Sequence, residues 1–200
     1  ELEQLANVIK RHEDVFVLAD EIYEHINYIG QHESIAQFPG MKERTILVNG
    51  VSKAYAMTGW RIGYIAAPEW IVKGCNKLQG QYTSGPCSLS QRAALAAYVT
   101  EQACVEEMRQ AFQRRRDLIV RLAKEIGGFE VNEPQGAFYL FPKCSSYFGK
   151  SDGQHTINSA TDLAMYLLET AHVATVGGDA FGDSECIPVS YTHLTLPTTP

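Results

Sequence analysis

The 200-residue sequence lacks the features that mark several common classes of protein. Its longest apolar runs fall far short of the roughly 20 residues that cross a bilayer, and no secretory signal segment is visible. It has 23 acidic and 17 basic side chains, a formal net charge of −6, and no basic stripe of the kind that binds nucleic acid. We therefore expect a globular, cytoplasmic protein with neither a membrane nor a nucleic acid as partner.

The usual patterns of disulfide and metal chemistry are also missing. The five cysteines are odd in number, widely scattered and without a Cys-x-x-Cys motif, so we expect reduced, mostly buried thiols. These are Cys75, Cys87, Cys104, Cys144 and Cys186. The histidines show no metal-ligand grouping, and we predict no metal site.

What the sequence does contain is a lysine and an arginine at a fixed spacing between two apolar runs. Residues 50–63 read GVSKAYAMTGWRIG, after an apolar run at 45–48, so Lys53 is predicted to lie at a strand end, where α/β proteins place their chemistry. A lysine amine can form a Schiff base with an aldehyde, and the guanidinium of Arg61 can clamp a phosphate. An aldehyde that also carries a phosphate is pyridoxal phosphate. Taken alone, a lysine is more often a solvated surface charge.

A second group lies upstream, where the continuous apolar run at 15–19 ends in Asp20-Glu21-Ile22-Tyr23. Such a run predicts a buried parallel strand. A carboxylate at its end ordinarily caps the next turn. Paired with Lys53, Asp20 gains a chemical interpretation, because a carboxylate can keep the pyridine nitrogen of the cofactor protonated.

Residues 50–63 resemble, position for position, the cofactor attachment motif of the class I and II aminotransferases, and the prokaryotic aspartate aminotransferases in particular. The motif has a small residue before the lysine and an arginine eight positions after it. The resemblance covers about residues 1–187. It implies that the catalytic residue is Lys53, which binds the cofactor and acts as general base, and that the other cofactor-binding residues are Asp20 at the ring nitrogen, Tyr23 at the ring oxygen, Arg61 at the phosphate and Ser52, which takes the place of a hydroxyl absent at Gly50.

The same resemblance implies the fold class. We expect the C-terminal part of a PLP-dependent transferase fold, with residues 1–110 in a large, mostly parallel α/β cofactor domain and residues 111–187 in a smaller, incomplete α+β domain. Helical spacing extends from 89 to 126, too far for one compact helix without a bend. Further strands are predicted at 129–131, 137–141 and 173–176, with a helix at 161–171.

The resemblance stops at the position where relatives carry the arginine that binds the substrate carboxylate. This chain has Pro188 there, which supplies neither a cation nor a backbone donor, so the substrate-binding residues are unknown. We expect residues 188–200 to be a non-native or frame-shifted tail rather than part of the fold. We also expect the chain to be an internal-to-C-terminal fragment, because the family's glycine-containing phosphate loop is not found in it.

The predicted function is that of a PLP-dependent aminotransferase that moves the amino group of an L-amino acid, aspartate favoured, to a 2-oxo acid such as 2-oxoglutarate by a ping-pong mechanism. The resemblance implies a homodimer as the full-length protein. Three alternatives remain. A PLP-dependent lyase shares the fold and the same residues. A non-catalytic cofactor-sensing domain would accompany a DNA-binding module. The chain as written is also expected to be inactive by itself.

Overall fold

A computed structural model describes residues 1–192 of the chain, which divides into two compact units, Glu1–Arg109 and Gln110–Pro200. The first unit is called unit 1 and the second unit 2. The long helix α4 (Ala103–Glu125) contains the residues at which one unit ends and the other begins. Each unit has its own set of strands, so each is described by itself.

Unit 1 begins with helix α1, which places one apolar face against the sheet. The packed face consists of Leu2, Ala6 and Ile9, with Ala6 fully buried beside Ile35 and Met41 in a small core, whereas Leu5 and Val8 are exposed. The elements of unit 1 before α4 are, in chain order, α1 (Leu2–Ile9), β1 (Val17–Asp20), η1 (Ile35–Gln37), η2 (Lys42–Arg44), β2 (Thr45–Gly50), η3 (Thr58–Trp60), β3 (Gly63–Ala66), α2 (Glu69–Tyr82) and α3 (Ser88–Val99).

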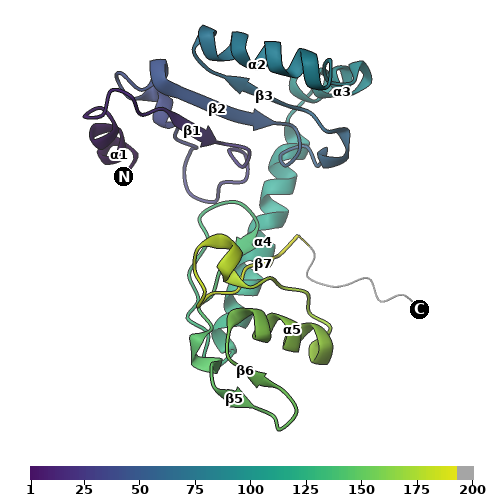
Figure 1. Cartoon of the computed structure of the whole chain (residues 1–200). Helices are drawn as coiled ribbons and strands as arrows, with labels where there is room; N and C mark the ends of the chain where they lie inside the picture. Colours follow the sequence, from purple (N-terminus) through teal and green to yellow (C-terminus); the bar gives the residue numbers. More distant parts are fainter. Residues whose placement is uncertain (193–200) are drawn as a thin grey trace. The chain divides into compact units, whose positions relative to one another are not determined.

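The three strands form one mixed sheet in the order β1-β2-β3 (Figure 1). β1 and β2 are parallel, with Asp20 opposite Val48, so both strands end at the same edge of the sheet. β3 is antiparallel to β2 and brings Gly63 opposite Gly50. The parallel β1 was predicted, but burial on both of its faces was not observed. Leu18 is 69% exposed, because only the opposite side of β1 packs on α1.

The predicted bend in the long helical stretch is present as a break between α3 and α4 at residues 100–102. Gln102 occupies this break and accepts the backbone N–H of Val105 at 3.0 Å, so it begins α4, while Thr100 closes α3 with a backbone bond to Ala96. The break therefore results from one helix ending and another beginning, not from a kink within a continuous helix.

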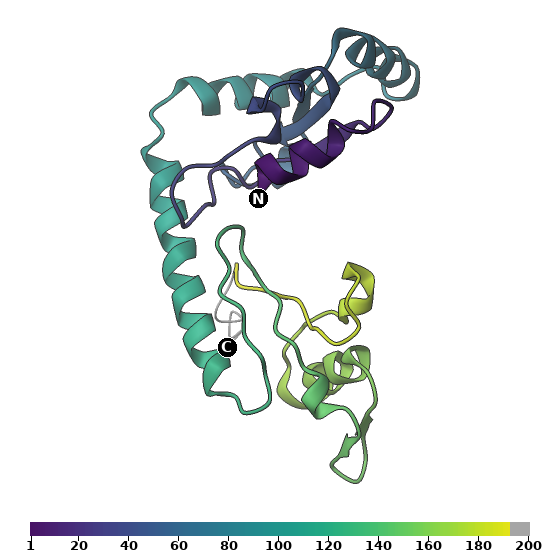
Figure 2. The same cartoon turned by 90° about the vertical axis from the view of Figure 1, so that its left-hand side faces the viewer.

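Unit 2 contains several short elements and one further helix. They are β4 (Tyr139–Leu140), η4 (Ser145–Tyr147), β5 (Lys150–Ser151), β6 (Thr156–Ile157), α5 (Ala160–Ala171), η5 (Gly178–Phe181) and β7 (Val189–Ser190). Ser159 caps α5 by accepting the N–H of Asp162, and α5 packs beside the β5–β6 hairpin (Figure 2). The apolar core gathers Cys144, Ile157, Leu163 and Ile187.

Three strand predictions in unit 2 differ from the structure. At 129–131 only Glu130 pairs, through one isolated bridge to Lys143. The strand expected at 137–141 is shortened to β4, because Ala137 has a φ of 56° and interrupts the extended run. Residues 173–176 form no strand within residues 1–192. An apolar run indicates burial but does not by itself supply a pairing partner.

The segment after residue 187 also differs from expectation. Val189 and Ser190 form β7, which is antiparallel to β4, and Tyr191 is fully buried with its hydroxyl 3.2 Å from the Ala137 carbonyl. Val189 and Ser190 thus pair within unit 2, while the non-native or frame-shifted origin of residues 188–200 stays a prediction. The rest of the predicted tail, 193–200, lies outside the described residues.

The cysteines are less buried than predicted, since Cys75, Cys87 and Cys104 are exposed and only Cys144 and Cys186 are buried. Cys75 lies on α2, which has no buried residue, Cys87 precedes the first turn of α3, and Cys104 lies in the first turn of α4. Among residues 1–192, no helix is long and apolar enough to cross a membrane.

Candidate active site

The predicted lysine lies where the sequence placed it, in the turn that follows β2. The Tyr55 N–H donates to the Val51 carbonyl at 3.3 Å and the Ala56 N–H to the Lys53 carbonyl at 3.2 Å, so the chain folds back immediately after the strand. The Lys53 side chain is partly buried, and its Nζ lies 5.6 Å from the centre of the Tyr23 ring. The structure thus brings together the predicted amine and the predicted phenol.

These two residues meet because β1 and β2 are parallel neighbours. Asp20 is the last residue of β1, and Tyr23 lies in the turn that follows. Lys53 lies in the turn after β2, at the same edge of the sheet. Asp20 itself is exposed rather than buried. Its Oδ1 accepts the N–H of Ile22 at 3.3 Å, which is the ordinary turn-capping role of such a carboxylate. Its second oxygen is the atom that remains for a ligand.

The next residue, Glu21, was not predicted to matter, yet it is the most buried acidic side chain at this edge. Its carboxylate is 9% exposed and accepts the hydroxyl of Ser34 at 2.6 Å, with the His32 Nε2 at 2.8 Å. Its backbone N–H extends the β1–β2 ladder by donating to the Val48 carbonyl at 2.9 Å. Glu21 therefore fixes the start of the turn that carries Tyr23. Ser34 and His32 lie more than ten positions from Glu21 in the sequence, so no local pattern indicates this contact.

Arg61 and Ser52 are held close together by a third residue, Thr58. The Thr58 hydroxyl donates to the Ser52 carbonyl at 3.0 Å, and the Thr58 carbonyl accepts from Arg61 Nη1 at 2.9 Å. Arg61 is exposed, and a guanidinium has five N–H donors, of which this contact uses one. The role of Thr58 was not predicted from the sequence. The only local indication of a turn at this position is a hydroxyl residue followed by Gly59 inside a loop.

Two residues of this loop have a strained backbone. Ala56 and Arg61 both have a φ of 52°, in the left-handed region that side chains with a Cβ rarely adopt. Such conformations persist only where the surrounding contacts require them, and they collect at ligand-binding sites. The strain on either side of Met57–Trp60 supports a functional role for the loop that includes Lys53 and Arg61.

Pro188, which stands at the expected position of the substrate arginine, lines a hollow of about 720 Å³ in unit 2. The residues around it are apolar or neutral, namely Tyr139, Phe141, Ala174, Thr175, Val176, Phe181, Pro188 and Ser190. None of these lining side chains carries a positive charge. The hollow therefore lacks a group that binds a carboxylate by charge.

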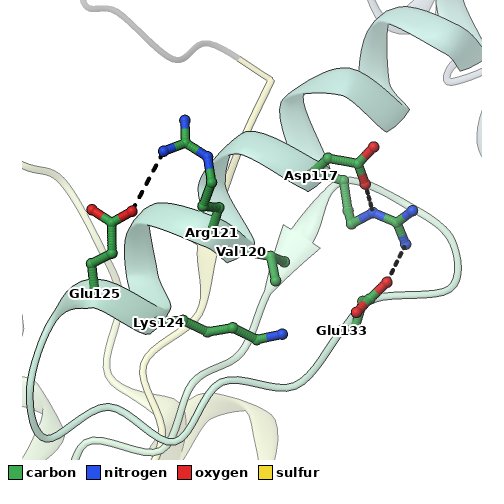
Figure 3. Close-up of a pocket in the computed structure, with 7 residues that line it drawn as sticks. Asp117, Val120, Arg121, Lys124, Glu125 and Glu133 are labelled. Atoms are coloured by element: carbon green, nitrogen blue, oxygen red, sulfur yellow. Dashed lines mark hydrogen bonds and ion pairs between the residues drawn. The ribbon is translucent and has the colours of Figure 1, made fainter.

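A separate pocket of about 430 Å³ lies along α4 in unit 2 and involves none of the predicted site residues (Figure 3). Arg116 is its most buried charge. It donates to Asp117 and to the Pro134 carbonyl, both at 2.6 Å, with Glu133 3.8 Å away. Arg116 is therefore a paired, structural cation, and Arg115 of the same helix donates to the Thr192 carbonyl.

The chain is similar to known proteins along nearly all of its length. The sequence profile described as "Aminotransferase class I and II" matches residues 1–198. A bifunctional aspartate aminotransferase and glutamate/aspartate-prephenate aminotransferase from Petunia hybrida is 51% identical over 195 residues, which are 95% of this chain and 41% of that protein. The aspartate aminotransferase of Rhizobium meliloti strain 1021 is 47% identical, over 94% of this chain and 46% of the relative.

Solved structures agree with the sequence comparison. The crystal structure of the aspartate aminotransferase from Rhizobium meliloti superposes with a TM-score of 0.91 at 46% identity, and covers 96% of this chain and 48% of that one. The aromatic aminotransferase from Pyrococcus horikoshii OT3 has a TM-score of 0.87 at 39% identity, over 96% and 50%. The chain spans about half the length of these relatives. The predicted fold class is confirmed, and the chain belongs to the aminotransferase class I and II family.

Proposed function

We propose that the chain contributes to a PLP-dependent aminotransferase that transfers the amino group of an L-amino acid, with aspartate favoured, to a 2-oxo acid such as 2-oxoglutarate. The observation that carries the proposal is the placement of Lys53 Nζ 5.6 Å from the Tyr23 ring at the common edge of β1 and β2. The names of the relatives from Petunia hybrida and Rhizobium meliloti support aspartate as the amino donor.

The donor set of unit 1 fits pyridoxal phosphate. An amine, a carboxylate, a phenol and a guanidinium are the groups that its aldehyde, ring nitrogen, ring oxygen and phosphate require. Lys53, Asp20, Tyr23 and Arg61 supply them from one loop and one strand end. When bound, the cofactor takes up the amino group and draws electrons from the substrate Cα.

Each residue then has a defined task. Lys53 would hold the cofactor and, once released from it, move the proton at the substrate Cα as general base. Asp20 would keep a proton on the ring nitrogen through its second oxygen, and Tyr23 would donate to the ring oxygen. Arg61 would bind the phosphate with the donors not used on Thr58, assisted by Ser52.

We further propose that unit 1 is part of the large cofactor domain and unit 2 part of the small domain of a cytoplasmic homodimer. Under this proposal the substrate carboxylate lacks a partner in unit 2, because Pro188 and the other residues lining its hollow are uncharged. Catalysis by a protein with Pro188 would need a cation from elsewhere. The same observation favours the alternative that the domain binds the cofactor without turnover.

The first test asks whether Lys53 binds the cofactor. The full chain is incubated with pyridoxal phosphate, reduced with borohydride and mapped by peptide mass spectrometry. We expect a saturable adduct on the peptide with Lys53, and much weaker labelling of Lys73, an exposed lysine 2.7 Å from Glu69. Equal labelling of both lysines would contradict the cofactor site.

The second test separates the reactions. Residues 1–192 replace the matched region of the Rhizobium meliloti aspartate aminotransferase, with Pro188 retained or changed by Pro188→Arg. We expect the retained proline to give little turnover and the arginine to restore formation of glutamate from 2-oxoglutarate with aspartate as donor. Release of ammonia without a new amino acid would indicate a lyase. Cofactor binding without any product in both grafts would support the non-catalytic alternative.

A further inference from the structure

The aromatic side chain two residues after Lys53 contacts three other parts of unit 1. The Tyr55 hydroxyl lies 2.7 Å from Oε1 of Gln102, at the break between α3 and α4. The Tyr55 ring meets the Tyr98 ring of α3 edge-on at 5.4 Å and the His25 ring at 6.3 Å. Because His25 follows Tyr23 by two residues, Tyr55 joins the turn that carries Lys53 to the turn that carries Tyr23.

The direction of the hydrogen bond follows from the other contacts of Gln102. Its Nε2 lies 3.0 Å from the Ala97 carbonyl and 2.5 Å from the Thr100 carbonyl, both of which can only accept. The amide therefore presents its oxygen to Tyr55, and the phenol must donate. Burial is the main cause that raises the pKa of Tyr55 above its usual value, so the hydroxyl keeps its proton at neutral pH.

The turn that Tyr55 closes needs such a tether. The backbone N–H of Tyr55 donates to Val51, and the next residue, Ala56, has a φ of 52°. A strained turn relaxes when the contacts that impose its conformation are removed. Tyr55 is partly buried, and its hydroxyl bonds Gln102, which lies 47 positions later in the sequence and immediately precedes α4.

From these contacts we infer that Tyr55 and Gln102 are positioning residues: their hydrogen bond fixes the turn that presents Lys53 to Tyr23. The inference rests on the proposed role of Lys53, but the contact itself can be tested without cofactor. Tyr55 and Gln102 act through the backbone of residues 51–56.

The experiment measures two reactions of Lys53 in the full chain. The first is acetylation by a trace of acetic anhydride, which reports the exposure of the amine, and the second is borohydride trapping of pyridoxal phosphate. Tyr55→Phe removes only this bond, whereas Gln102→Leu also removes the two bonds from Nε2 to the Ala97 and Thr100 carbonyls. Tyr55→Phe should speed acetylation and slow trapping roughly fivefold, which is the ratio that one neutral hydrogen bond of about 1 kcal/mol gives, and Gln102→Leu should change both rates at least as much.

Three further variants separate positioning from general stability. The double variant should show no change beyond that of Gln102→Leu, because the bond to the Tyr55 hydroxyl is already lost in that variant. In Gln102→Glu a carboxylate oxygen would face the Ala97 and Thr100 carbonyls, to which it cannot donate, so the acceptor for the phenol should be displaced and both rates should shift as in Gln102→Leu. Tyr98→Phe, which removes a hydroxyl 3.3 Å from Tyr64 in the same aromatic group, should leave Lys53 as in the wild type. The reactivity of Lys73 serves as the internal standard in every sample.

The outcomes are distinct. Unchanged acetylation of Lys53 in Tyr55→Phe would overturn the inference, as would equal changes at Lys73 or in Tyr98→Phe, because these indicate global loosening. If the wild-type Lys53 is not trapped by the cofactor while its acetylation still responds to Tyr55→Phe, the positioning contact stands and the proposed function fails.

Discussion

Replacement of Glu21 by alanine should loosen the edge of the sheet at which Asp20 and Tyr23 lie. Glu21 is 9% exposed and has a partner on each carboxylate oxygen, Ser34 at 2.6 Å and His32 at 2.8 Å. A hydrogen bond to a charged group contributes about 1.5–3 kcal/mol, and a pair with a partly exposed partner contributes less. The side chain of His32 is 32% exposed. We therefore expect a loss on the order of 2–3 kcal/mol in the local opening free energy.

Hydrogen exchange of the β1–β2 amides in the full chain measures this quantity, because the Glu21 N–H is itself bonded to Val48. Glu24→Ala is the matched control. Glu24 is four positions from Asp20 and lies 3.2 Å from His25, but the His25 side chain is exposed and that of Glu24 is partly exposed, so its loss should cost less than about 0.5 kcal/mol. Equal and small effects of Glu21→Ala and Glu24→Ala would refute the assignment of Glu21 as the anchor of this turn.

Three other predictions address separate features. Gly50→Ala should destabilise unit 1 by about 1–3 kcal/mol in urea unfolding, since a Cβ there would lie 2.9 Å from the Gly63 Cα and from a neighbouring carbonyl. Cys87 should react with iodoacetamide faster than Cys186. The backbone N–H of Ser90 is the main cause that lowers the pKa of Cys87, whereas burial raises that of Cys186 to about 11, so Cys87 has the larger thiolate fraction of the two. Asp152 accepts the backbone N–H of His155, the largest cause that lowers its pKa to about 2. Its folded-state pKa is depressed, so its stabilisation of the β5–β6 hairpin should be complete above about pH 4 and disappear toward pH 2 in an NMR titration.

The elements that the sequence predicted well are those specified by local patterns. The apolar runs before Asp20 and Lys53 predicted strands where β1 and β2 lie, and the helical spacing at 89–126 predicted helix where α3 and α4 lie. The order of Asp20, Tyr23 and Lys53 then placed their side chains at one edge, because parallel strands end together. The placement of these residues could be predicted without knowing any contact between distant parts of the chain.

The features that were missed depend on contacts between residues far apart in the chain. Leu18 is exposed because one face of β1 has no covering element within residues 1–192. The strand at Val189–Ser190 exists because β4 offers it a partner about 50 positions earlier. Neither pairing nor coverage is encoded in the local alternation of apolar and polar residues, so no local pattern indicated that Tyr191 would be buried.

The candidate chemistry is divided unevenly between the two units. In unit 1 the amine, phenol, carboxylate and guanidinium are all present, and their loop keeps two residues, Ala56 and Arg61, in a strained conformation. In unit 2 the hollow that contains Pro188 has no cation among its lining residues. Cofactor binding and substrate binding therefore depend on different residues and can fail independently. A graft that binds pyridoxal phosphate but transfers no amino group until Pro188→Arg is introduced would place the defect in substrate binding alone, because the arginine adds a carboxylate partner and leaves every residue around Lys53 unchanged.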